Sequence, residues 1–137
     1  MRLNPYFKEE ISRELKDHSI LMCYQCGKCS SFCPVFNLSP EKFNPRKLIE
    51  MVYIGAEDVL KTEDIWRCTT CYECFENCPQ KVNFVEIIFL LRTKATERGY
   101  APKIPMQELV LVRKEGFSVQ ISPRAKKWRE EVIKIGG

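Results

Sequence analysis

The stretch CYQCGKCSSFCP, residues 23–34, decides the fold of this 137-residue chain, and CTTCYECFENCP at residues 68–79 repeats its pattern. Both stretches read C-x2-C-x2-C-x3-C-P, which is the spacing that holds cubane iron–sulfur clusters. Together they account for all 8 cysteines of the chain. We therefore predict two [4Fe–4S] clusters and a role in moving electrons.

The spacing also predicts which thiols share a cluster. Three cysteines separated by two residues let one tight loop cover three iron corners, and the fourth cysteine ligates the other cluster in two-cluster proteins. We therefore assign four thiols to each cluster. Cluster one takes Cys23, Cys26, Cys29 and Cys78. Cluster two takes Cys68, Cys71, Cys74 and Cys33.

Two other uses of the cysteines fit the pattern less well. Structural zinc takes pairs of C-x2-C, often with histidine, and leaves the third cysteine of each run without a role. The one histidine, His18, lies outside both runs. Disulfides are typical of small secreted chains, and residues 1–10 lack the apolar segment of a signal peptide. Structural zinc stays as the alternative, which iron analysis separates from the cluster prediction.

Composition fits one small domain in which the clusters form part of the core. The formal net charge is +4. About eight thiolates and about four positive charges from two oxidised cluster cores bring the sum near zero, so the charge gives no argument for nucleic acid. The longest apolar stretch, residues 84–91, contains Glu86 and is too short to span a bilayer. We expect a cytoplasmic protein with no membrane span.

The residues between the two runs are predicted to be helical. Asn44 followed by Pro45 is a typical helix start, and apolar residues at 48, 49, 52 and 53 form one side of a helix that ends near Gly55. Short helical turns are expected at residues 56–60, and at residues 62–66 after a cap at Thr62. Helices instead of hairpins thus join the cluster loops, which predicts an all-α, α-helical ferredoxin fold.

Helices are also predicted on both sides of the cluster loops. Asn4 and Pro5 begin the first one. Asn83 begins a long helix over residues 84–98, which Gly99 closes. Apolar residues cover more than one side of this long helix, so it either packs wholly into the core or presents part of its surface to a partner.

The C-terminal stretch is predicted to form a helical extension. We place the di-cluster domain at residues 1–100 and the extension at residues 101–137, with helices that begin at Pro105 and Pro123. Trp128 lies among lysines and arginines in the extension. We expect these residues to contact a partner protein and not nucleic acid, because the chain has no nucleic-acid-binding motif.

The chain resembles the C subunit of heterodisulfide reductase and its relatives. The resemblance is carried by residues 23–34, by Asn44-Pro45-Arg46 in the linker and by WRCTTCYECFENCP at residues 66–79. It covers roughly residues 4–99. The same α-helical ferredoxin module also occurs in iron–sulfur subunits of succinate and fumarate oxidoreductases.

The resemblance implies an electron relay. In that family the C subunit holds two [4Fe–4S] clusters between a flavin-containing A-type partner and a catalytic B-type partner with cysteine-rich CCG motifs. This chain has no spare cysteine, no CCG motif and no G-x-G-x-x-G, so we expect it to be non-catalytic alone. The alternative is an iron–sulfur subunit, or a free ferredoxin-like carrier, of another oxidoreductase such as a quinone-linked dehydrogenase.

Residues beside the cysteines could adjust the clusters. Lys28, Arg67 and Lys81 would favour the reduced, more negative cluster, whereas Glu73 and Glu76 would oppose them. An ordinary charged surface explains these five residues equally well. Flanking aromatic residues are expected to exclude water from the clusters, or simply to pack in the core. They are Tyr24, Phe32, Phe36, Trp66, Tyr72 and Phe75.

Overall fold

The described part of the chain is built from helices and the loops between them. The computed structural model describes residues 3–15, 19–102, 110, 112–114, 122–125, 127–128 and 131. The chain divides into two units, Met1–Ala101 and Pro102–Gly137. Among the described residues the β structure consists of one isolated antiparallel bridge, between Leu3 and Ala56. The predicted all-α fold is therefore confirmed.

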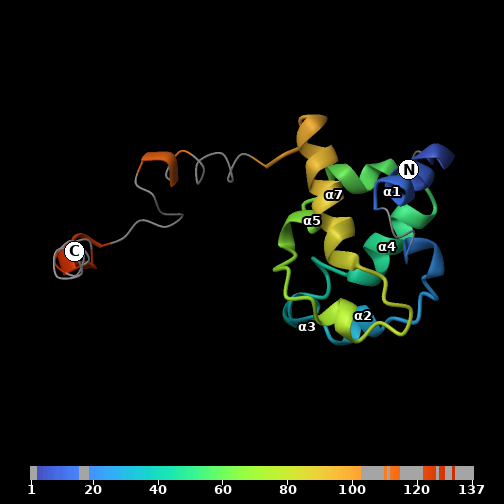
Figure 1. Ribbon diagram of the computed structural model, residues 1–137, viewed down its shortest axis with the longest axis horizontal. Coiled ribbons are helices and arrows are strands. Elements are labelled where there is room, and N and C mark those ends of the chain that lie inside the picture. The colour runs from blue at the N-terminus through green and yellow to red at the C-terminus, as the bar shows by residue number, and fades with distance from the viewer. Residues whose placement is uncertain are drawn as a thin grey trace. The chain divides into compact units, whose positions relative to one another are not determined.

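The first unit contains short helices around the cysteine runs and longer helices outside them (Figure 1). In chain order the elements are α1 (Pro5–Glu14), η1 (Ser19–Met22), α2 (Lys28–Ser31), α3 (Pro34–Leu38), α4 (Pro45–Tyr53), η2 (Glu57–Lys61), α5 (Asp64–Arg67), α6 (Glu73–Glu76) and α7 (Phe84–Glu97). The two η elements are 3-10 helices.

Asparagine side chains begin the three longest helices, as the sequence predicts. Asn4, Asn44 and Asn83 each accept a hydrogen bond from a backbone N–H in the first turn of α1, α4 and α7. Proline occupies the first helical position of α1 and of α4. These local signals work because a cap needs only residues that are neighbours in the chain.

The short turns of the linker differ in detail from the prediction. Residues expected as a short helix at 56–60 form the 3-10 helix η2 instead. The predicted cap at Thr62 is wrong, because α5 begins after Glu63. Thr62 instead donates its hydroxyl to the carbonyl oxygen of Val59 at 2.8 Å, which satisfies a carbonyl at the end of η2.

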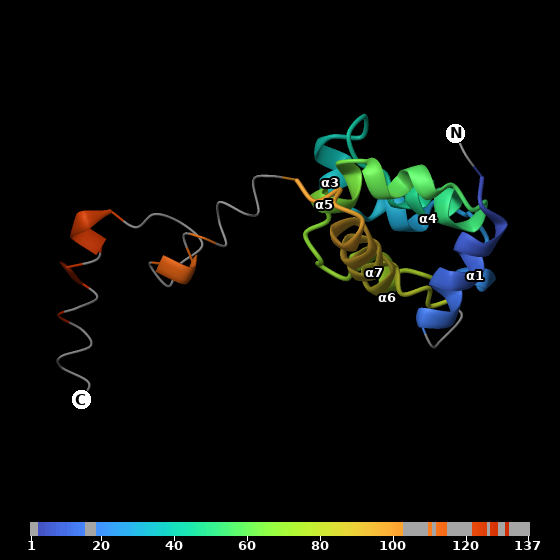
Figure 2. The same ribbon diagram turned by 90° about the horizontal axis from the view of Figure 1, so that it is seen from above.

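The long helix α7 contacts four other elements of the first unit, α1, η2, α5 and α6 (Figures 1 and 2). Its apolar residues are mostly in the core, while the Phe89 side chain is 48% exposed. The buried ones are Phe84, Val85, Ile87, Ile88, Leu91 and Ala95. Of the two uses that the sequence left open, core packing therefore accounts for most of this helix.

The N-terminal segment is held against the end of α4 at Gly55. The Asn4 N–H donates to the Gly55 carbonyl oxygen at 2.8 Å. Gly55 has a φ of +77°, and a Cβ added there would lie 2.3 Å from the Asn4 carbonyl oxygen. Only glycine fits this close approach of two backbone segments.

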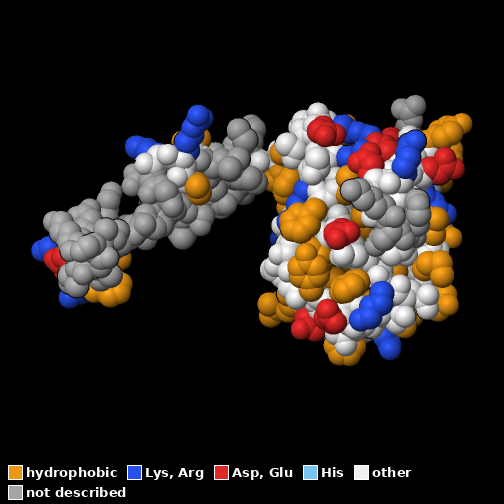
Figure 3. Space-filling view, in the orientation of Figure 1, with side chains coloured by type: hydrophobic (Ala, Val, Ile, Leu, Met, Phe, Trp, Pro, Cys, Tyr) orange, Lys and Arg blue, Asp and Glu red, His pale blue; other side chains and the backbone are white. Residues whose placement is uncertain are grey.

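The surface of the first unit mixes both signs of charge. On the face in Figure 3, acidic and basic side chains lie among each other, with apolar side chains between them. No helix in the described part of the chain is long and apolar enough to cross a membrane.

Much of the predicted C-terminal extension lies outside the described residues, as does His18. The helix start at Pro105 is among the residues that are not described. At the second predicted start, residues 123–125 are helical and the Ala125 N–H donates to the Ser122 hydroxyl at 3.2 Å. The Trp128 side chain is 68% exposed.

Candidate iron–sulfur centre

The two cysteine loops adopt the same backbone conformation. The residue before the second cysteine is left-handed in both, with φ of 55° at Gln25 and 56° at Thr70. The residue after that cysteine is left-handed too, with φ of 83° at Gly27 and 65° at Tyr72. The four-residue helices α2 and α6 then follow and contact each other. The sequence repeat is therefore also a structural repeat.

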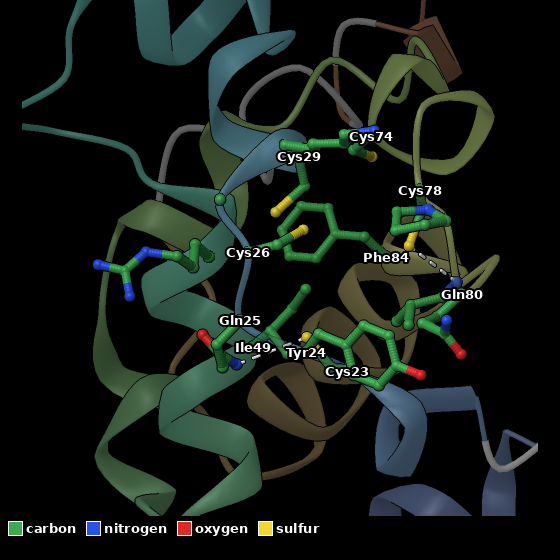
Figure 4. Close-up of a pocket in the computed structure, with 15 residues that line it drawn as sticks. Cys23, Tyr24, Gln25, Cys26, Cys29, Ile49, Cys74, Cys78, Gln80 and Phe84 are labelled. Atoms are coloured by element: carbon green, nitrogen blue, oxygen red, sulfur yellow. Dashed lines mark hydrogen bonds between the residues drawn. The ribbon is translucent and has the colours of Figure 1, made fainter.

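The first cavity lies inside loop one (Figure 4). It encloses about 430 Å³, counted together with the space that opens to solvent. Five cysteines border it, namely Cys23, Cys26, Cys29, Cys74 and Cys78. The four thiols predicted for cluster one are thus brought to one cavity, with Cys74 from the other predicted set at its edge.

The second cavity lies inside loop two and encloses about 280 Å³ on the same measure. Its cysteines are Cys33, Cys68, Cys71 and Cys74, which is the set predicted for cluster two. Cys74 and Phe84 border both cavities, so the two cavities share a wall. Which sulfur binds which cluster stays a prediction, which the placement of these thiols supports.

The thiols fit a cluster better than a single ion. All eight cysteines are free, including those that face the same cavity. Within the described residues, no group of three or more His, Cys, Asp or Glu side chains could hold one metal ion. Thiols spread around a hollow suit a cubane with iron at four corners, whereas zinc needs its ligands around one point.

Among the described residues, several donors reach cysteine sulfurs at the cavities. They include Gln25 Nε2 on Cys23 at 3.6 Å, Thr70 N on Cys68 at 3.4 Å and Val82 N on Cys78 at 3.3 Å. Ser30 also forms a hydrogen bond to Cys29. A donor to sulfur favours the charged thiolate, which is the form that binds iron. The left-handed backbone at residues 25 and 70 lets each residue turn back to the first cysteine of its loop.

Burial opposes the thiolates that iron requires. Desolvation raises the pKa of the Cys29 thiol to about 11 and that of Cys74 to about 12. It also raises the pKa of Cys23 and of Cys68. At neutral pH these groups are therefore thiols in the chain alone, and iron binding releases their protons. The positive charge of the iron then stabilises the thiolates.

The charged residues that the sequence singled out are partly neutralised. Arg67 pairs with Glu63 at 3.1 Å, and Lys81 pairs with Glu76 at 3.8 Å. Lys28 borders the first cavity, as does Arg46 from α4. Nothing in the sequence pattern places Arg46 at this cavity, because α4 and loop one meet only through the fold.

Arg92 is a residue near cavity two that sequence reasoning missed. It lies on α7, and its Nε and Nη2 donate to the carbonyl oxygens of Ile65 at 2.9 Å and Cys68 at 2.8 Å. Its guanidinium carbon is 5.8 Å from the centre of the Trp66 ring. Arg92 thus holds the segment that enters loop two in place, although Arg92 and Cys68 are 24 residues apart in the chain. In the sequence, Arg92 cannot be distinguished from an arginine on the exposed side of a helix, so this contact could not be predicted.

The aromatic residues buried at the cavities are not the ones that the sequence pattern selected. Tyr24, Phe32 and Tyr72 are exposed. The aromatic rings buried at the cavities are Phe43 and Phe84, which are each 1% exposed and have centroids 6.5 Å apart. Phe43 borders cavity two and Phe84 borders both cavities. Sequence reasoning did not select Phe43, because it is not adjacent to any cysteine.

Comparison with known proteins agrees with this geometry. The 4Fe-4S dicluster domain family matches residues 19–82. The iron–sulfur C subunit of the CoB–CoM heterodisulfide reductase of Methanopyrus kandleri is 32% identical over 95% of this chain and 71% of its own length. The C subunit of the ferredoxin:CoB–CoM heterodisulfide reductase of Methanosarcina mazei is 31% identical over 90% of this chain and 77% of its own length.

The chain belongs to the C-subunit family of heterodisulfide reductases. The C2 subunit of the H2/formate:CoB–CoM heterodisulfide,ferredoxin reductase of Methanococcus maripaludis is a further member, 37% identical over 83% of this chain, and the chain spans 61% of its length. The matched dicluster domain contains both cysteine runs. Membership in this family therefore confirms the predicted resemblance, and the domain confirms the prediction of two [4Fe–4S] clusters.

Proposed function

We propose that this chain relays electrons through two [4Fe–4S] clusters in a heterodisulfide-reductase-type complex. The partners in this proposal are a flavin-containing, A-type protein and a catalytic, B-type protein with CCG motifs. The observation that carries the proposal is the pair of thiol-bordered cavities with a shared wall at Cys74 and Phe84. When bound, the clusters supply one-electron transfer. A shared wall between the cavities favours clusters that are neighbours.

The sequence and the cavities offer no cysteine or cofactor motif for a reaction other than electron transfer. All eight cysteines border one of the two cavities, and the sequence holds no CCG motif or dinucleotide-binding motif. The substrate reaction is therefore assigned to the partners. The role of this chain is to hold the clusters, exclude water with Phe43 and Phe84, and fix the distance between the cavities.

Crossed ligation is part of the same proposal. The set Cys23, Cys26, Cys29 and Cys78 holds one cluster, and the set Cys68, Cys71, Cys74 and Cys33 holds the other. The contact between α2 and α6 supports it, because each of these helices precedes the last cysteine of its own loop. Each last cysteine then reaches the neighbouring cavity.

The surface offers two routes to partners. Cys26 and Cys71, the second cysteine of each loop, are exposed, so each cavity reaches the surface at its own loop. We propose that electrons enter at one loop and leave at the other. The extension at residues 101–137 is proposed to contact a partner through exposed residues such as Trp128. A cytoplasmic location is proposed together with this complex.

Anaerobic co-purification tests the proposed function. For this experiment, an affinity tag is added to the C-terminus of the chain. The tagged chain is then isolated without oxygen from cells that express it together with its genomic neighbours. We expect a stable complex that contains a flavoprotein and a protein with CCG motifs. A Trp128→Ala chain is the matched comparison and should retain its iron while holding the partners more weakly. A tagged chain that elutes as a free, reducible monomer with no flavoprotein contradicts the relay and favours a diffusible carrier.

A further inference from the structure

The side chain of Gln25 turns back to a cluster sulfur. Gln25 lies between Cys23 and Cys26, and its left-handed φ of 55° brings its amide nitrogen to 3.6 Å from the Cys23 sulfur (Figure 4). Its amide oxygen, Oε1, is buried. Within the described residues it is the one buried side-chain oxygen or nitrogen that has no hydrogen-bond partner.

The unpartnered oxygen of Gln25 indicates that the amide is oriented to donate a hydrogen bond to the Cys23 sulfur. A buried polar atom without a partner costs about 1–3 kcal/mol. The bond from Nε2 to a neutral Cys23 thiol is weak compensation, and a charged acceptor makes such a bond markedly stronger. Turning the amide over would place its oxygen on the thiolate, where the two negative groups repel. The arrangement therefore fits a sulfur that carries negative charge.

Loop two provides an internal comparison, because the backbone of the two loops matches. Thr70 occupies the position of Gln25, with φ of 56°. Its backbone N–H reaches the Cys68 sulfur at 3.4 Å, but its hydroxyl donates to the Thr69 carbonyl oxygen at 2.7 Å. The backbone N–H of Gln25 also forms a hydrogen bond to Cys23. Both loops thus share the backbone donor, and loop one adds the side-chain donor of Gln25.

We propose that Gln25 is a positioning residue that raises the reduction potential of the cluster in cavity one. The inference rests on the proposed function, since it requires a bound cluster. A bound cluster that accepts one electron from a partner protein would carry part of the added negative charge on its cysteine sulfurs. A hydrogen-bond donor on one of those sulfurs stabilises the reduced state more than the oxidised state. The amide of Gln25 is such a donor, and it is fixed by the loop.

The test is an EPR-monitored redox titration of the anaerobic holoprotein. Gln25→Met keeps the length and unbranched shape of the side chain and removes the donor. We expect it to lower one of the two midpoint potentials and to leave the other unchanged. Gln25→Thr installs the residue that loop two already accommodates at this backbone angle, and it should shift the same potential in the same direction.

Gln80→Met is the matched control. Gln80 borders the same cavity, and in the described structure its side chain makes no hydrogen bond to a cysteine sulfur. Its substitution should leave both potentials in place. The proposal is overturned if the Gln25 variants shift neither potential, if they shift both equally, or if Gln80→Met produces the same shift. If Gln25→Met fails to assemble, Gln25→Thr decides the question by the same criteria.

Iron and sulfide analysis separates this inference from the relay itself. A Gln25 variant with about eight irons and unshifted potentials overturns only the role of Gln25. A wild-type chain without about eight irons overturns the two-cluster relay, whatever the titration shows.

Discussion

At the residue scale, the cluster loops depend on a few left-handed backbone positions. Gly27 and Tyr72 occupy equivalent places after the second cysteine of each loop, with φ of 83° and 65°. Glycine adopts such angles freely, whereas other residues lose about 1–2 kcal/mol. The repeated motif thus uses glycine in one copy and tolerates tyrosine in the other, which shows that the loop geometry is imposed by its surroundings.

Gly27→Ala should cost about 1 kcal/mol and should not abolish cluster binding. A Cβ at this position would lie 3.8 Å from Cδ of Arg46, which is ordinary contact, so only the backbone angle is unfavourable. We expect about eight irons per chain and a melting temperature lower by roughly 4–8 °C, followed by cluster absorbance without oxygen. Tyr72→Gly, the reciprocal change, should also retain both clusters. Loss of a cluster in Gly27→Ala would show that the Cβ meets the cluster itself.

At the element scale, α7 is joined to α1 by a buried lysine. Lys94 contacts Glu14 at 2.7 Å and also Glu10, and its side chain is 8% exposed. Burial lowers the pKa of Lys94, but the hydrogen bonds and charges of the two glutamates outweigh it, so the pKa is raised. The lysine is therefore charged at neutral pH. Its contribution is complete below its usual pKa of 10.5 and is lost only as the pH rises through the higher folded value.

Lys94→Met should destabilise the domain by about 1 kcal/mol, because Glu14 loses its partner and Glu10 keeps only Arg98 at 3.8 Å, while water reaches both partly exposed carboxylates. The measurement is the anaerobic melting temperature at neutral pH. Lys61→Met is the control, since Lys61 pairs with Asp58 at the surface with its side chain 57% exposed, and such pairs contribute little. Equal effects of the two substitutions would contradict a structural role for Lys94. Adding Glu10→Gln and Glu14→Gln to Lys94→Met should restore part of the stability.

The element scale also shows where sequence reasoning stops. Helix starts at Asn4, Asn44 and Asn83 were predictable, because the cap and its N–H partner are neighbours in the chain. The contacts of Lys94 and Arg92 join residues 80 and 24 positions apart, respectively. In the sequence, neither residue can be distinguished from a charged residue on the exposed side of a helix. Such contacts become visible only when the helices are packed.

At the scale of the whole molecule, the cysteine spacing carried most of the functional prediction. It predicted the two clusters and the grouping of the thiols, because ligand spacing is a local property that cluster chemistry constrains tightly. The wall between the cavities was not predictable. Its residues, Cys74 and Phe84, come from different segments, and the Phe84 ring meets that of Phe43 only through the fold. The donor at Gln25 was likewise hidden, because a left-handed angle at glutamine has no sequence signal.

The most direct test of crossed ligation in a two-cluster chain is the iron content of one variant series. The starting variant replaces Cys68, Cys71 and Cys74 by alanine and should retain about four irons, in the cluster of loop one. Adding Cys33→Ser should then change nothing, whereas adding Cys78→Ser should remove the remaining iron. The reverse outcome, with iron lost through Cys33→Ser and kept through Cys78→Ser, would contradict crossed ligation. A colourless wild-type chain with zinc in place of iron would contradict the clusters altogether.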